Sequence, residues 1–329
     1  MPSLVVAMVG AGWMAREHAQ ELSRRPDIVI RGVCDVDGER AAALAGEHGA
    51  RPFGDWADMV DAVVPDAVWV CTPPGLHAEP ALGLFELGLP VYLEKPIARS
   101  VTDGRAIAAR AGELGVVCAV GYQWHALDLL GAVRHALDGR PIGFAVGKNI
   151  GNAMARPWFV NRAQGGGNIL ERGSHHIDLV RTLGGEVTSV QAAASAVSLG
   201  GRPPETGDIE DGLTMILHLE SGGTATILVV WLGAGLPGSY NLEIAATDAL
   251  LALELDPDFR LSGTVGGTSV EAHSTSPPLR SSIDRFLAAI QSRDPSDVAC
   301  TPADALRTLA VAHAAEEALE TGEKVTVAG

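Results

Sequence analysis

An apolar run that ends in a glycine-rich turn constrains the fold of this chain more than any other feature. Residues 4–9 are continuously apolar, as expected for a strand that is covered on both faces of a parallel sheet. They lead into the GxGxxA turn Gly10-Ala11-Gly12-Trp13-Met14-Ala15, and a helical pattern follows until Pro26. A strand, this turn and a helix in that order predict a dinucleotide-binding unit.

Each small residue of this turn has a physical role. Gly10 allows the tight turn, and Gly12 lets the backbone approach a pyrophosphate. Ala15 lets the helix pack close to the strand, so that its N-terminal N–H groups point at the anion. We therefore assign Gly10, Gly12, Trp13 and Met14 to a cofactor site.

The second predicted strand, residues 28–34, ends at an acidic residue, Asp35. A carboxylate at this place accepts hydrogen bonds from the ribose hydroxyls of NAD and repels the 2′-phosphate of NADP. NAD is therefore favoured, while the nearby Arg40 keeps NADP open. The alternative is that Asp35 only caps the turn into the next helix.

Further strands alternate with helices at the pace of a doubly wound sheet. The predicted strands 67–71, 90–93 and 116–120 are separated by helical patterns, and Ser100 and Asp103 have the spacing of a capping box. Because ligands bind at the carboxyl edge of such a sheet, the turns after these strands are candidate site segments.

A lysine in one of these turns stands out in a chain that otherwise prefers arginine. Lysine occurs only at positions 95, 148 and 324 among 24 Lys plus Arg residues. Unlike arginine, a lysine can shift its pKa and pass a proton at accessible pH. We therefore interpret Lys95 as a reactive residue at the cofactor site; the alternative is an ordinary surface lysine.

The glycine turn and helix of residues 165–178, GGGNILERGSHHID, supply candidate acid–base groups. Glu171, His175 and Asp178 are spaced i, i+4, i+7, which predicts one stripe of a helix. Such a stripe can hold and tune a proton-transfer group, although it can equally be a solvated face. We consider a metal site at Glu171, His175 and His176 weak, because adjacent helical residues point about 100° apart and a full ligand set is missing.

Composition excludes several classes of function. A chain of 329 residues suggests two domains, and its net charge of −16 disfavours nucleic acid and anionic membranes as partners. The N-terminus lacks the features of a signal peptide, and we find no membrane-spanning run. The four cysteines lack metal-binding spacing, and three of them lie in predicted buried strands, where they would act as small apolar residues. A reducing cytoplasm is therefore the expected location.

The second half of the chain predicts a large sheet. Residues 142–150 read as a strand, and residues 214–219 and 224–232 form a hairpin through Ser221-Gly222-Gly223. The strand 224–232 is apolar on both faces, so one face needs a second partner. We expect a homo-oligomer, a dimer or tetramer, built on this sheet. Amphipathic helices at 279–290 and 303–319 end the chain.

Taken together, these motifs resemble the glucose–fructose oxidoreductase/inositol dehydrogenase (Gfo/Idh/MocA) family. The likeness rests on the GxGxxA turn, Asp35, Thr72-Pro73-Pro74 with His77, Glu94-Lys95-Pro96, and Glu171-x-Gly173-x-His175-x-x-Asp178 after three glycines. It implies an α/β protein in which a Rossmann domain at 1–121 precedes a substrate and oligomerisation domain at 122–329. The second domain would have an open, mainly antiparallel sheet, with the last helix packing back on the first domain.

The resemblance also implies a reaction. Family members transfer hydride between a nicotinamide cofactor and a carbinol or carbonyl carbon of a sugar, cyclitol or related polyol, and their Lys-Pro bond is often cis. Carried onto this chain, the catalytic residues are Lys95, His175 and Glu171. The cofactor site gains Thr72, Pro73, His77, Glu94 and Lys95, and no metal is expected.

Two departures from the family pattern bear on the substrate. Glu171 stands where the family commonly has aspartate, and the run 121–125 is aromatic where the family is often basic. A neutral polyol is therefore favoured over a phosphorylated or acidic substrate. The predicted substrate wall comprises Tyr122, Trp124, Arg156, Trp158, Arg162 and His176. Trp158 and Phe159 can serve as a platform for a sugar ring or only as anchors of their loop.

Two other functions remain open at this stage. One is a non-catalytic NAD-binding sensor, which need not keep the set Lys95, Glu171 and His175. The other is a hydrolase, lyase or epimerase that uses tightly held NAD transiently. The sequence does not name the substrate, the oxidised carbon or the physiological direction.

Overall fold

The computed structural model describes residues 3–152, 158–197, 209–233 and 235–328 and divides into two compact units. The first unit comprises residues 1–123 and 279–306, and the second comprises residues 124–278 and 307–329. The domain boundary near residue 121 stays a prediction, as does the packing of the last helix. Most of that helix, α10 (Pro302–Thr321), groups with the second unit, whereas the segment 279–306 groups with the first.

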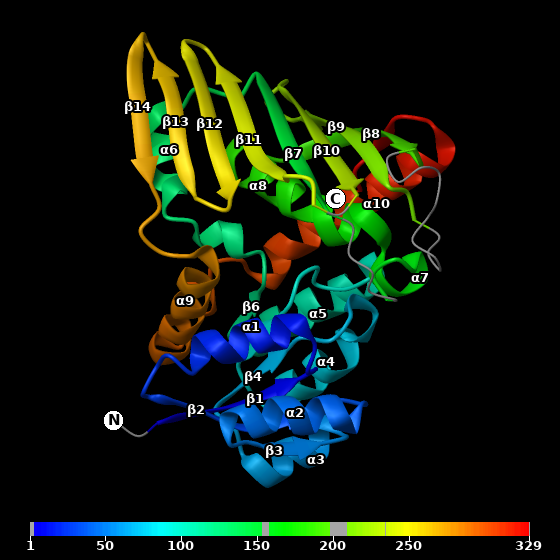
Figure 1. Cartoon of the computed structure of the whole chain (residues 1–329), viewed down its shortest axis with the longest axis vertical. Coiled ribbons are helices and arrows are strands. Elements are labelled where there is room, and N and C mark those ends of the chain that lie inside the picture. The colour runs from blue at the N-terminus through cyan, green and yellow to red at the C-terminus, as the bar shows by residue number, and fades with distance from the viewer. Residues whose placement is uncertain (1–2, 153–157, 198–208, 234, 329) are drawn as a thin grey trace. The chain divides into compact units, whose positions relative to one another are not determined.

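The first unit contains a parallel sheet in the order β3-β2-β1-β4-β5-β6, counted over the described residues (Figure 1). This is the strand order of the dinucleotide-binding Rossmann fold, so the predicted doubly wound architecture is confirmed. The strand β3 was not predicted from the sequence; it is short and lies at the sheet edge. The strands are β1 (Leu4–Val9), β2 (Ile28–Cys34), β3 (Arg51–Phe53), β4 (Ala67–Val70), β5 (Val91–Leu93) and β6 (Cys118–Val120).

Helix α5 (Val101–Leu114) begins and ends at recognisable caps. The Ser100 hydroxyl accepts a hydrogen bond from the Asp103 backbone N–H at 3.0 Å, so the predicted capping spacing is confirmed. Gly115 ends the same helix in the left-handed conformation, which glycine adopts without steric cost. The helices are α1 (Trp13–Leu22), α2 (Gly38–His48), α3 (Trp56–Val63), η1 (Pro74–Leu76), α4 (Ala78–Glu86), α5 (Val101–Leu114), α9 (Pro278–Ser292) and η4 (Pro295–Asp297).

Helix α9 belongs to the core of the first unit although it is distant in sequence. The Phe286 ring lies edge-on to the rings of Trp69 and Tyr92, with centroids 5.2 and 5.5 Å apart. The Tyr92 hydroxyl, which would otherwise be buried without a partner, hydrogen-bonds the Ser282 hydroxyl at 2.8 Å. These contacts join the chain's late segment to the strands that carry the candidate cofactor turns.

The second unit contains a mixed, mostly antiparallel sheet in the order β14-β13-β12-β11-β7-β10-β9-β8-β15 within the described residues (Figure 1). The hairpin that the sequence predicted is confirmed as β9 and β10, which pair antiparallel, and β10 pairs parallel with β7. The strands are β7 (Phe144–Asn152), β8 (Val187–Ser195), β9 (Gly212–Leu219), β10 (Thr224–Leu232), β11 (Ser239–Ala246), β12 (Ala249–Asp256), β13 (Arg260–Val265), β14 (Thr268–His273) and β15 (Val325–Thr326).

Helices cover one face of this sheet. Helix α8 (Ser174–Gly184) packs on β7 and β10, and α6 (Leu129–Leu137) packs on β12 to β14. The face of β10 under the helices carries Ala225, Ile227, Val229 and Trp231, all fully buried, whereas its opposite face is half-buried. The strand therefore presents Ala225, Ile227, Val229 and Trp231 on one face and Leu228, Val230 and Leu232 on the other, as the sequence predicted. The remaining short elements are η2 (Gln123–Ala126) and α7 (Arg162–Gly165).

The segment before α8 corrects one expectation. The sequence predicted a single regular helix starting near Asn168, but Ile169–Gly173 form a π-turn, η3, and α8 begins only at Ser174. A π-turn inserts one extra residue per turn, so Glu171 does not share the regular stripe assumed for it. Such turns occur frequently at functional sites.

The cysteines and the helices bear on two further expectations from the sequence. All four cysteines are buried and outside disulfides, including those that the sequence placed in buried strands. In the part of the chain that the structure describes, every helix is too short or too polar to cross a membrane.

Candidate active site

The turn after β1 has the geometry that a diphosphate requires. Gly10 has φ +97°, and a Cβ there would lie 2.7 Å from the Cys71 carbonyl carbon, so only glycine fits. A Cβ at Gly12 would meet none of the described atoms within 4 Å, which leaves open space beside the backbone. Ala15 is fully buried, and Trp13 is 53% exposed at the start of α1. The turn therefore fits the cofactor that the sequence predicted.

Asp35 is joined to the glycine turn by its carboxylate. Its Oδ2 accepts a hydrogen bond from the Ala11 N–H at 2.8 Å, and its Oδ1 accepts from the Asp37 N–H at 2.9 Å and from Arg40 Nη2 at 2.8 Å. Burial acts to raise the pKa of Asp35, but these hydrogen bonds hold it below its usual value. Asp37, rather than Asp35, caps α2.

His77 connects the two turns that follow β4 and β5. Its ring nitrogens lie 2.8 Å from the Thr72 carbonyl oxygen and 3.3 Å from the Ile97 carbonyl oxygen. The side chain is fully buried, and burial lowers the pKa of His77, so the ring is a neutral brace. The Lys95–Pro96 bond is cis, as the resemblance implies. His77 thus links the two turns through these carbonyl oxygens. Thr72 and Pro73 are half-exposed.

Glu94, in the second of these turns, pairs with a buried histidine that was not predicted from the sequence. Glu94 is 5% exposed, and its Oε1 lies 2.7 Å from Nε2 of His18 on α1. Burial acts to raise the pKa of Glu94, but the hydrogen bond with His18, the charge of His18 and then the charge of Lys95 hold it below its usual value. In the sequence, His18 has the helical spacing of a core residue, so its contact with Glu94 could not be predicted from the spacing.

In the second unit, Glu171 and His175 come from consecutive turns. Glu171 is buried within η3, and His175 is half-buried in the first turn of α8. The indole of Trp124 lies against the His175 imidazole, with ring centroids 5.1 Å apart and planes tilted by 45°. Trp124 therefore restricts the orientation of this imidazole.

Arg172 anchors the π-turn to the sheet. Its Nη2 donates hydrogen bonds to the backbone and side-chain oxygens of Asn149 at 3.1 and 2.8 Å, and Nη1 donates to the Val230 carbonyl oxygen at 3.3 Å. In return, Asn149 Nδ2 donates to the Arg172 carbonyl oxygen at 3.1 Å. Burial lowers the pKa of Arg172, and the surrounding oxygens compensate for the buried charge. This clamp determines the place of the neighbouring Glu171.

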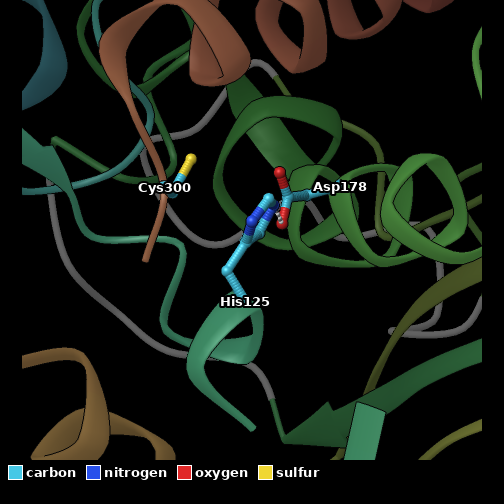
Figure 2. A group of neighbouring side chains, drawn as sticks. All are labelled: His125, Asp178 and Cys300. Carbon is cyan, nitrogen blue, oxygen red and sulfur yellow. Dashed lines mark ion pairs between the residues drawn. The ribbon is translucent and has the colours of Figure 1, made fainter. Parts of the chain in front are cut away.

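Asp178 pairs with an imidazole other than His175. Figure 2 shows the His125 side chain pointing at Asp178, and the His125 Nε2 atom lies 2.8 Å from Asp178 Oδ2. Asp178 Oδ1 also accepts a hydrogen bond from the Thr308 hydroxyl at 2.9 Å. The carboxyl is 1% exposed, and burial raises the pKa of Asp178. The expectation of one functional stripe from Glu171 to Asp178 is therefore corrected: Asp178 orients His125.

The predicted substrate wall is distributed over several environments. Trp158 is half-buried against Phe159, with centroids 5.6 Å apart, and Phe159 stacks on Trp231 at 5.4 Å, so Phe159 anchors the loop. Arg162 forms an ion pair with Glu210. Tyr122 and Trp124 are buried, and Arg156 lies outside the described residues.

His176 is the wall residue that its environment supports least. It is fully buried, its ring packs against Gly147 and Trp124, and its Nε2 lies 3.1 Å from the Asn241 carbonyl oxygen. Burial lowers the pKa of His176 to about 4, so the ring is neutral at pH 7. This position is that of a core histidine and does not support direct contact with substrate.

Comparison with known proteins identifies the class to which this fold and these motifs belong. A model of the oxidoreductase family with an NAD-binding Rossmann fold matches residues 4–122, and a model of the GFO/IDH/MocA C-terminal domain matches residues 139–266. The chain is therefore a member of the Gfo/Idh/MocA family of NAD-binding oxidoreductases. The family resemblance inferred from the motifs is confirmed.

Individual members of the family and one solved structure show how similar this chain is to proteins with named activities. The chain is 32% identical to D-glucoside 3-dehydrogenase from Escherichia coli K12, covering 70% of this chain and 69% of that protein. It is 27% identical to inositol 2-dehydrogenase 3 from Saccharopolyspora erythraea, covering 98% and 95%. The structure of levoglucosan dehydrogenase in complex with NADH and levoglucosan has a TM-score of 0.86, with 20% identity over 99% of this chain and 100% of that chain. At that identity the last comparison establishes the fold.

Proposed function

We propose that this oxidoreductase transfers a hydride between NAD and a carbinol or carbonyl carbon of a sugar, cyclitol or related neutral polyol. One observation carries the proposal: the Glu94-Lys95-Pro96 turn follows β5 at the carboxyl edge of the sheet whose first turn leaves space for a diphosphate. A lysine beside a nicotinamide site is suited to redox chemistry on an oxygen-bearing carbon. The names of the relatives support the substrate class, since they include a glucoside and an inositol dehydrogenase.

The proposed roles follow from the chemistry of each side chain. His175, held by Trp124, takes the proton of the substrate hydroxyl, because a neutral imidazole can accept a proton near pH 7. Lys95 stabilises the alkoxide that develops as this proton leaves. Glu171, fixed through Arg172, hydrogen-bonds Lys95 or the substrate. When bound, the nicotinamide supplies the hydride acceptor or donor.

The groups that hold the cofactor belong to the first unit. Gly10, Gly12, Trp13 and Met14 would hold the diphosphate, and Asp35 would accept hydrogen bonds from the ribose. Around the nicotinamide, the proposed groups are Thr72, Pro73, His77, Glu94 and Lys95. NADP is a secondary possibility through Arg40, whose exposed guanidinium pairs with Asp35.

The proposed substrate wall is aromatic and amide-rich rather than basic. The half-buried Trp158 offers a flat apolar surface to a sugar ring. The Phe159 ring packs edge-on against its indole. The one charged wall residue with described contacts, Arg162, is already neutralised by Glu210. A neutral polyol therefore suits this wall better than a phosphorylated substrate. Tyr122, Trp124 and Arg156 complete the proposed wall.

A substrate screen tests the proposed function. The enzyme is mixed with NAD or NADP and a panel of glucosides, inositols and other polyols, and with NADH or NADPH and keto-sugars, while nicotinamide absorbance is followed. We expect net turnover with at least one neutral polyol and preference for NAD. If cofactor stays bound through purification and every substrate gives no net NADH, a transient use of NAD replaces this proposal.

A homo-oligomer built on the open face of the second unit's sheet is also part of the proposal. The face of β10 away from the helices carries Leu228, Val230 and Leu232, and the neighbouring strand β9 adds the exposed Ile216. Covering such a face with a second copy removes apolar area from water. Light scattering after size exclusion should give a dimer or tetramer; monomer alone at micromolar concentration would contradict this. The four buried cysteines, which form no disulfide, support a cytoplasmic location.

A further inference from the structure

The indole of Trp124 lies between two histidines that are neighbours in the sequence. Its ring centroid lies 5.1 Å from that of His175, with planes tilted by 45°, and 5.1 Å from that of His176, with planes at 90°. Adjacent residues of a helix point about 100° apart, so the indole occupies the angle between the two imidazoles. Trp124 is 8% exposed, so most of its surface faces protein rather than a bound substrate.

The His176 side of this arrangement is fixed to the sheet. His176 is fully buried, and its Nε2 lies 3.1 Å from the Asn241 carbonyl oxygen on β11. A Cβ at Gly147 of β7 would lie 2.7 Å from His176 Cδ2, so glycine leaves the room that this ring occupies. Because a packed interior has little free space, the His176 imidazole forms a rigid wall on one side of Trp124.

The residue after Trp124 ties η2 to the helix that carries His175. The His125 side chain points toward Asp178 on α8 (Figure 2), and its Nε2 lies 2.8 Å from Asp178 Oδ2 and 2.9 Å from Thr182 Oγ1. The Thr182 hydroxyl donates to the Asp178 carbonyl oxygen at 2.8 Å, so its oxygen is left to accept from the Nε2–H of His125. His125 therefore holds η2 against α8 at two places.

The carboxylate that faces His125 is itself held from α10. Asp178 is buried, and its Oδ1 accepts a hydrogen bond from the Thr308 hydroxyl at 2.9 Å. The Thr308 oxygen in turn accepts from Arg181 Nη1 at 2.7 Å. Hydrogen bonds are strong in a low-dielectric interior, and a connected set of them resists rearrangement. The anchor of η2 on α8 is therefore a fixed point of the second unit.

We propose that Trp124, anchored through His125 and Asp178, is a positioning residue that sets the direction of the His175 imidazole. A general base must lie within hydrogen-bond reach of the proton that it takes, and a small misplacement costs rate. The half-buried His175 ring can rotate about its side-chain bonds, and the indole beside it restricts that rotation. The proposal rests on the proposed function in making His175 the base.

NMR of the histidine rings tests this positioning without a substrate. The full chain has ten histidines, so protein labelled in histidine gives few signals, and His175→Gln assigns those of His175 by their loss. Because an indole shifts the proton signals of a ring packed against it, the His175 signals should be displaced from those of the exposed His135 on α6. Trp124→Leu should abolish this displacement, and Trp124→Phe should keep part of it. Identical His175 signals in the wild type and Trp124→Leu would contradict the proposal.

The anchor is tested by variants that leave the indole in the chain. His125→Leu removes both contacts with α8, so the His175 signals should move toward those of His135 or broaden. His125→Gln, which retains an amide donor, should restore wild-type signals, and His135→Gln is the matched control. Thr182→Val keeps the shape and removes one contact, so it should give a smaller change. Unchanged His175 signals in His125→Leu, or in Thr182→Val when His125→Leu does not fold, would overturn the proposal.

Steady-state kinetics separates positioning from direct contact with substrate. With NAD and the polyol that the substrate screen identifies, Trp124→Leu should lose about tenfold or more in kcat and change KM little, since the base is present but misdirected. Trp124→Phe should retain most of the wild-type kcat. A rise in KM with unchanged kcat in Trp124→Leu would show that the indole only binds substrate, and the positioning role would be wrong.

Failure of this proposal and failure of the proposed function have different signatures. The NMR measurement needs neither cofactor nor substrate, so it tests only the link from η2 and Trp124 to His175. Turnover of His175→Ala tests only the part that His175 plays in the reaction. Unchanged His175 signals alongside an inactive His175→Ala would refute the positioning role alone, whereas wild-type turnover in His175→Ala would refute the base role whatever the NMR signals show.

Discussion

At the scale of single residues, the most informative side chains are charged groups that are buried and held by polar partners. Glu94, Asp178 and Arg172 are each buried and each held by identifiable partners: His18 for the first, His125 and Thr308 for the second, and backbone oxygens for the third. Because an uncompensated buried charge is costly, such arrangements persist where something other than packing requires them. Glu94 and Arg172 each lie next in sequence to a residue that we propose as catalytic, Lys95 and Glu171 respectively.

Arg40 gives a prediction about cofactor choice. Its Nη2 donates a hydrogen bond to Asp35 Oδ1 at 2.8 Å. Because the Arg40 side chain is 54% exposed, it can turn toward a 2′-phosphate. Arg40→Ala should weaken NADP binding by about tenfold through loss of a charge-assisted contact. It should leave NAD binding unchanged or tighter, since a lone pair of Asp35 becomes available to the ribose.

Titration calorimetry with both cofactors measures this difference. Arg110→Ala is the matched control, because Arg110 is another surface arginine of the same unit that pairs with a carboxylate, Glu86. Equal loss of NAD and NADP affinity in Arg40→Ala would show that Arg40 supports the fold of the turn and not the choice of cofactor.

At the scale of elements, interruptions of regular structure place the candidate groups. The π-turn η3 precedes α8 and gives Glu171 and His175 directions that a continuous α-helix would not provide. Helix α8 is held in turn by Asp178, whose contacts with η2 and α10 fix the axis of the helix. The proposed base, His175, therefore lies on a helix that contacts both η2 and α10 through Asp178.

Asp178 predicts how pH affects the stability of the second unit. Burial raises the pKa of Asp178 above the value of about 3.9 expected for an unfolded chain. The folded state then binds more protons than the unfolded state, so this residue's contribution to stability decreases as pH rises from the unfolded pKa through the raised folded value. In Asp178→Asn this pH-dependent loss should disappear, because the amide does not ionise.

Denaturant unfolding as a function of pH measures the effect. The wild type should lose stability between acidic pH and neutrality more steeply than Asp178→Asn does. Asp304→Asn, on the first turn of α10, provides a control carboxyl in the same helix that contacts Asp178. Parallel stability curves for the wild type and Asp178→Asn would contradict the prediction.

At the scale of the whole molecule, the sequence predicted the architecture better than the site. Parallel strands buried on both faces are continuous apolar runs, so β1 and β2 were predicted with their observed ends. The strand β3, Arg51–Phe53, was missed because three partly exposed residues carry no such signal. The positions of turns at the sheet edge followed directly from the strand pattern.

The partners of buried polar residues could not be predicted in the same way. His18 fits the apolar face of α1, and its contact with Glu94 joins residues 76 positions apart. Periodicity describes local faces and carries no information on such pairings. The stripe assumed for Glu171, His175 and Asp178 failed for a related reason, since a π-turn leaves no mark in the spacing of residues.

We propose that Lys95 and His175 serve one hydride-transfer reaction on a neutral polyol. Its most direct test is steady-state turnover with the best substrate of the screen, for Lys95→Ala, His175→Ala and the control Lys148→Ala. We predict that each of the first two variants loses at least about a hundredfold in kcat, in line with loss of an acid–base or electrostatic group, while the control keeps wild-type turnover. Wild-type turnover in either Lys95→Ala or His175→Ala would contradict the claim.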